Sequence, residues 1–131
     1  MKKLFLILAL IGCVLAAPTS LDAQRTQITV TTLLNAQSAA TTTGTIPGPI
    51  NGNKITIYVA ASAGVSAGVV TIEEAATSSY TGTWSVVQAV TTSAASTVTA
   101  VHLDGFYGAL RVRISTEITG GTVTVTSLHG D

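Results

Sequence analysis

The stretch Gly108-Ala-Leu-Arg-Val-Arg-Ile-Ser115 decides how this chain folds. Leu110, Val112 and Ile114 alternate with Arg111 and Arg113, so every second side chain is apolar and those between are charged. A period of two is typical of a strand with one face in a core and the other toward solvent. We therefore expect a strand over residues 108–115, with the three aliphatic side chains inward and both arginines outward.

The same alternation recurs on both sides of this stretch. We expect six further strands, over residues 27–34, 54–61, 69–76, 84–90, 97–103 and 122–128, rich in β-branched Thr and Val. In the first of them Ile28 and Val30 share one face, and Thr29 and Thr31 share the other. No stretch has the spacing of an amphipathic helix. Residues 35–46 are polar and Thr-rich, and form either a long surface loop or an eighth, edge strand.

Turn residues separate these stretches. Pro47-Gly48-Pro49 and Asn51-Gly52-Asn53 predict a break and a tight turn, and further turns are expected in 64–68, at Thr81-Gly82, at Asp104-Gly105 and at Gly120-Gly121. The last two pairs tolerate the positive φ that short hairpins require. Strands spaced about ten residues apart favour an all-β fold, a two-sheet antiparallel β-sandwich that is Ig-like or jelly-roll-like, with seven to eight strands. A closed barrel is the alternative.

The N-terminal segment has the pattern of an export signal. Lys2 and Lys3 precede an apolar run over residues 4–17, which is shorter than the roughly 20 residues of a membrane-spanning helix. We expect a signal peptide over residues 1–23, with cleavage before Gln24, and a single β-sandwich domain over 24–131. Leu10-Ile11-Gly12-Cys13 also resembles a bacterial lipobox, in which Cys13 would be lipidated; an uncleaved segment is the third alternative. The expected location is secreted or cell-surface, with an outer-membrane lipoprotein anchored through Cys13 as the alternative.

Composition excludes several functional classes. Residues 24–131 carry four basic and five acidic side chains, a net charge of −1. A nucleic-acid binder needs a basic face, and so does a protein held at a membrane surface by basic clusters, so neither is expected. Any membrane contact would come from the signal or a lipid anchor. Disorder is not expected either, because 47% of the chain is hydrophobic and only 9% is charged. Cys13 is the single cysteine, so the domain has no disulfide.

The residue types that carry catalysis are sparse and poorly placed. Glu73 and Glu74 are adjacent in an expected strand, so they point to opposite faces and are expected to be solvated. His102 and Asp104 could share a strand face, but no nucleophile-elbow serine accompanies them. His102, Asp104, His129 and Asp131 are weak metal ligands, without a helical His pair or a cysteine set. We therefore expect no enzyme, no metal and no cofactor.

Two small groups of residues are candidates for binding a partner. Tyr80, Phe106 and Tyr107 could stack on a glycan or meet a protein, whereas Trp84 is expected to fill the core between the sheets. Arg111 and Arg113 could clamp an anionic partner, or decorate a solvated face or guard a sheet edge.

One set of motifs resembles a known class. Tyr80-Thr-Gly-Thr-Trp84, then Gly105-Phe-Tyr107 before the strand at 110–114, and Gly120-Gly-Thr-Val-Thr-Val125 are similar to small β-sandwich virion modules of tailed phages, which include head-decoration, fibre-type and uncharacterised structural proteins. The resemblance implies a non-enzymatic surface or assembly module at a virion surface.

Strand faces that are rich in threonine and poor in charge indicate a surface that another protein covers. Thr122, Thr124 and Thr126 on one strand, and the threonines at 41–43 and 45, neither repel a neighbour nor strongly favour water. We expect self-association or a protein partner to cover part of this surface. The function favoured is an exported or virion-surface structural module that decorates or assembles on a larger structure. The alternative is a secreted, adhesin-like module that binds carbohydrate or a cell surface.

Overall fold

The computed structural model describes residues 28–46, 50 and 54–130, and all regular structure in this part of the chain is β-strand. Eight strands run in chain order: β1 (Ile28–Gln37), β2 (Thr43–Ile46), β3 (Ile55–Ala61), β4 (Ala67–Ala75), β5 (Ser85–Thr91), β6 (Val98–Leu103), β7 (Ala109–Thr119) and β8 (Val123–Gly130). The all-β prediction is confirmed, and each of the seven expected strands is present. Residues 35–46 hold the end of β1 and the short β2, so the edge-strand interpretation is confirmed.

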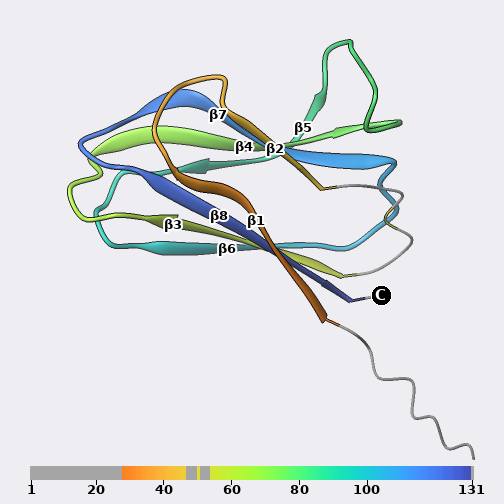
Figure 1. Ribbon diagram of the computed structural model, residues 1–131, viewed down its shortest axis with the longest axis horizontal. Helices are drawn as coiled ribbons and strands as arrows, with labels where there is room; N and C mark the ends of the chain where they lie inside the picture. Colours follow the sequence, from red (N-terminus) through yellow and green to blue (C-terminus); the bar gives the residue numbers. More distant parts are fainter. Residues whose placement is uncertain (1–27, 47–49, 51–53, 131) are drawn as a thin grey trace, which may run out of the picture.

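The strands form two antiparallel four-stranded sheets packed face to face (Figure 1). Sheet I has the order β1-β8-β3-β6, and sheet II has the order β2-β7-β4-β5. Along the chain, β1 is matched with β8, β2 with β7, β3 with β6 and β4 with β5. The chain therefore behaves as one long hairpin ribbon rolled into two layers, which is the jelly-roll arrangement and neither an Ig-like order nor a closed barrel.

The glycine turns have the expected backbone but join different strands than expected. Gly105 has a φ of 150° and Gly120 has a φ of 78°, which confirms the predicted positive φ. However, β6 and β8 belong to sheet I and β7 belongs to sheet II, so both turns carry the chain between sheets. The prediction of short hairpins at these two positions is wrong. Among the eight described strands, β4 and β5 are the one consecutive pair that lies side by side in a sheet.

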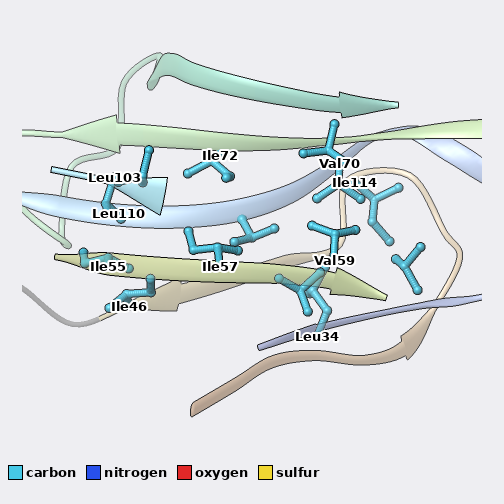
Figure 2. Close-up of a cluster of buried hydrophobic side chains, with 14 of the residues drawn as sticks. Leu34, Ile46, Ile55, Ile57, Val59, Val70, Ile72, Leu103, Leu110 and Ile114 are labelled. Atoms are coloured by element: carbon cyan, nitrogen blue, oxygen red, sulfur yellow. The ribbon is translucent and has the colours of Figure 1, made fainter. Parts of the chain in front are cut away.

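Aliphatic side chains from both sheets fill the space between the layers (Figure 2). Ile55, Ile57 and Val59 of β3 are almost fully buried, and they alternate with half-buried Thr56 and Tyr58. Leu110, Val112 and Ile114 of β7 are fully buried, as the alternation in the deciding stretch predicts. Each such side chain contributes about 1.5–3 kcal/mol on burial, so these inner faces hold the two sheets together.

The two edge strands of sheet I, β1 and β6, carry exposed apolar side chains. Ile28 and Val30 share a face of β1, as predicted, and this face is turned to solvent, with 65% and 63% of each residue exposed. Val98 in β6 is exposed to the same degree.

Several predictions concern residues outside those described: the signal segment with Cys13, cleavage before Gln24, the turns at 47–49 and 51–53, and Asp131. Within the described ranges no helix has the length and apolar character needed to cross a membrane.

Candidate functional site

The outer face of sheet II holds a buried carboxylate. Glu73 of β4 is only 3% exposed, and its Oε2 lies 2.6 Å from both Nε and Nη2 of Arg111. The Oγ1 of Thr71 donates a hydrogen bond to Glu73 Oε1 at 3.0 Å, and Arg113 Nη1 lies 3.7 Å from that oxygen. Both carboxylate oxygens are therefore occupied by partners from two neighbouring strands, and the charge of Glu73 is compensated within the chain.

Strand register creates this cluster. In the β4–β7 pairing Glu73 stands opposite Arg111, and Thr71 stands opposite Arg113. These positions alternate with the buried Ile72 and Val112, so the polar set lies on the outer side of the sheet. The prediction that Glu73 is solvated is wrong. The arginines do not guard an edge either, because β7 lies between β2 and β4.

Trp84 covers the arginine. The guanidinium carbon of Arg111 lies 4.5 Å from the centre of the Trp84 ring, within the range of a cation–π contact. Trp84 is buried, as expected, at 7% exposure. It packs on Arg111, which projects from the outer face of sheet II, so the prediction that it fills the space between the sheets is wrong. Its Nε1 donates a hydrogen bond to the carbonyl of Tyr80 at 3.2 Å.

A groove of about 470 Å³ opens beside this cluster, where β4 ends and β5 begins. Its walls come from the end of β4, the β4–β5 connection and the residue before β7, and the lining residues are Glu74, Ala75, Ala76, Tyr80, Thr83, Ser85 and Gly108. The β4–β5 connection projects from one end of the sandwich (Figure 1). The volume lies within the range of about 300–1,000 Å³ that is usual for small-molecule sites.

The polar side chains that line the groove have no partner among the described residues. Among the described residues, no hydrogen bond or ion pair engages the carboxylate of Glu74 or the hydroxyls of Tyr80, Thr83 and Ser85. Glu74 is half-buried and Tyr80 is 46% exposed. Glu73 and Glu74 thus point to opposite faces, as predicted, and have opposite roles: one is used inside the chain and the other remains available.

The other two predicted aromatics, Phe106 and Tyr107, directly precede Gly108, which lines the groove. Phe106 is 82% exposed, and Tyr107 is half-buried and packs against the core. The backbone of Tyr107 exchanges two hydrogen bonds with Ile50, which fixes the connection that leads through Gly108 into β7. Of the five candidate binding residues, Tyr80 lines the groove, Arg111 supports it through Trp84, and Arg113 remains half-exposed behind Glu73.

The two histidines do not assemble a metal or triad site among the described residues. His102 Nδ1 lies 3.1 Å from the Oγ1 of Thr56, on the opposite sheet from Glu73. No three His, Cys, Asp or Glu side chains lie together in the part of the chain that the structure describes.

Comparison with known proteins yields no relative: no protein-family model, curated protein or solved structure matches the chain.

Proposed function

We propose that this chain is a non-enzymatic structural module, exported or carried on a virion surface, that assembles with copies of itself through a sheet edge. The apolar N-terminal segment supports export, and the resemblance of the sequence motifs to virion modules of tailed phages supports the virion-surface alternative. Eight-stranded jelly rolls serve in capsids and in lectins, so the fold by itself does not choose between these roles. The distribution of charge along the strands carries the proposal.

Charged side chains in the described strands occur only on β4 and β7, the two central strands of sheet II: Glu73, Glu74, Arg111, Arg113 and Glu117. The four edge strands, β1, β6, β2 and β5, contain none. Soluble monomers usually place Lys or other charges on edge strands, because an exposed edge is a template for pairing with another chain. In this chain the charged side chains lie on central strands and the edge strands have none, which favours edge strands that pair with another chain.

The four edges differ in how well they are protected. β2 has only four residues, β1 has two register shifts against β8, and β5 has one against β4. β6 pairs with β3 in an unbroken register from Val98 to Leu103, and it has neither a charge nor a proline. Bulges and short length discourage pairing, so β6 is the edge best suited to receive another strand.

A second copy is the natural occupant of this edge. Antiparallel pairing of β6 with β6 of a second copy would join two four-stranded sheets into one, with backbone hydrogen bonds across a two-fold axis. The exposed residues along β6 include Val98 and Ala100, which would pack beside their counterparts.

The proposal is tested by sedimentation velocity on the purified chain and two lysine variants. Ala100→Lys places a charge in the middle of β6, where two lysines would approach each other in the pair. We expect it to raise the dissociation constant of the assembly by roughly tenfold or more. Ala39→Lys adds the same charge in the exposed turn between β1 and β2 and should leave assembly unchanged. A monomeric wild-type chain, or assembly that is equally sensitive to both variants, contradicts the proposal.

A further inference from the structure

We infer that the groove lined by Tyr80 and Glu74 is a binding site for a neutral carbohydrate. This goes beyond assembly through β6, because the groove lies at the end of sheet II and β6 is an edge of sheet I. Two functions on one small sandwich are compatible when their surfaces are separate.

The chemistry of the groove selects the class of ligand. A half-exposed tyrosine ring offers an aromatic face, and alanine and glycine leave room around it. Glu74, Thr83 and Ser85 place one carboxylate and two hydroxyls on the same walls. A sugar ring presents C–H groups on its face and hydroxyls on its rim, so it can stack on the tyrosine while its hydroxyls donate to Glu74. No basic residue lines the groove, which disfavours phosphates and acidic sugars.

The tyrosine is held in place before any ligand arrives. Trp84 Nε1 donates to the Tyr80 carbonyl, and the Tyr80 N–H donates to the carbonyl of Thr77 at 3.2 Å. The ring rests against Gly82, where a Cβ would collide with the phenol. Arg111 in turn holds Trp84 and is itself fixed by Glu73. Such a supporting chain of contacts lowers the ordering cost of binding.

The polar side chains of the groove differ from those of the neighbouring ion-pair cluster. Thr71, Glu73, Arg111 and Trp84 beside it all have partners within the chain. The polar side chains of the groove have none among the described residues. The contrast marks the groove as the part of this end of the sandwich that is open to an external ligand.

Binding can be measured by titrating the full chain with glucose, galactose, N-acetylglucosamine, maltose and cellobiose, followed by NMR chemical-shift changes. We expect at least one sugar to bind saturably. Tyr80→Ala should weaken that binding by roughly tenfold or more, since it removes the stacking surface. Glu74→Gln, which keeps the shape but loses the charged acceptor, should weaken it by several-fold.

Two controls separate the site from general effects. Phe106→Ala removes a more exposed aromatic that does not line the groove, and it should leave sugar binding unchanged. Gly82→Ala keeps every ligand-binding group but displaces the Tyr80 ring, and it should weaken binding in a chain that remains folded by circular dichroism.

The inference is overturned if the wild-type chain binds none of these sugars, or if Tyr80→Ala binds them as well as wild type does. Saturable binding of spermidine in their place would also overturn it, because the site would then recognise a cation through Glu74 and Tyr80. Sedimentation of the same samples reports assembly separately, so a failure of sugar binding and a failure of self-association are told apart.

Discussion

Sheets I and II bury the same kind of side chain on their inner faces, whereas their outer faces are built differently. The outer side of β3 and β8 carries half-buried Thr56, Tyr58 and Thr126, without an ionised group. The outer side of β4 and β7 carries the pair of Glu73 and Arg111 beneath Trp84. The inner faces follow from alternation alone, but each outer face depends on which strands are neighbours. Alternation along a strand therefore predicts which side chains are buried, whereas the contacts on an outer face depend on the order of strands in the sheet.

The largest effect we expect comes from breaking the ion pair that distinguishes sheet II. Arg111→Met leaves Glu73 buried without its main partner, which should lower the free energy of unfolding by about 3–5 kcal/mol. Arg113→Met is the matched control. Its Nη1 lies 3.7 Å from Glu73 and 37% of its side chain is exposed, so the loss should stay below about 1 kcal/mol.

Urea unfolding of both variants measures this difference, provided that the denaturant slope is unchanged. In the double variant Glu73→Gln with Arg111→Met, no buried carboxylate is left without its partner, and Arg113 is partly exposed to water, so much of the lost stability should return. Equal losses in the two arginine variants would show that Glu73 is not held mainly by Arg111.

The inner and outer faces of sheet I can be compared in the same way. Ile57→Ala opens a cavity between the sheets, since Ile57 is fully buried, and it should cost about 2–5 kcal/mol. Val30→Ala, on the exposed side of β1, should change the stability of the monomer by less than about 0.5 kcal/mol. Thermal unfolding at several protein concentrations separates the two effects. A large, concentration-dependent loss for Val30→Ala would show that copies also meet on this face, not only along β6.

Much of the fold was predictable because it depends on local order in the chain. Alternation in β3, β7 and β8 predicted strands, and it assigned the inward residues of β7 correctly. β2 stayed undecided, because four residues, Thr43–Ile46, are too few to show a period. The exchange of sheets at Gly105 and Gly120 could not be foreseen, since a glycine with positive φ fits a hairpin and a crossover equally well.

The site was harder to predict because its contacts are long-range. Glu73 and Arg111 lie 38 residues apart, and only the neighbouring positions of β4 and β7 bring them together. The predicted position of Trp84 was wrong because the pairing of β4 with β5 has a register shift between Ile72 and Glu73. The shift lets Val87 pack on the core while Val86 is 57% exposed, so Trp84 no longer shares a face with the buried Val90.

An effect smaller than those of Arg111→Met and Ile57→Ala is expected at Trp84, the residue that links the ion pair to the groove. Trp84→Phe keeps an aromatic face for Arg111 but removes the Nε1 donor to the Tyr80 carbonyl, so it should cost about 0.5–1.5 kcal/mol in urea unfolding. Val86→Ala, at a neighbouring exposed position, should cost less. If the hydrogen bond orders the β4–β5 connection, backbone amides from 77 to 83 should exchange faster in Trp84→Phe while amides in β3 and β8 do not. Unchanged exchange over 77–83 would mean that Gly82 and the turn at Tyr80 position the tyrosine without the hydrogen bond from Trp84. The ion pair of sheet II would then have no effect on the order of the groove.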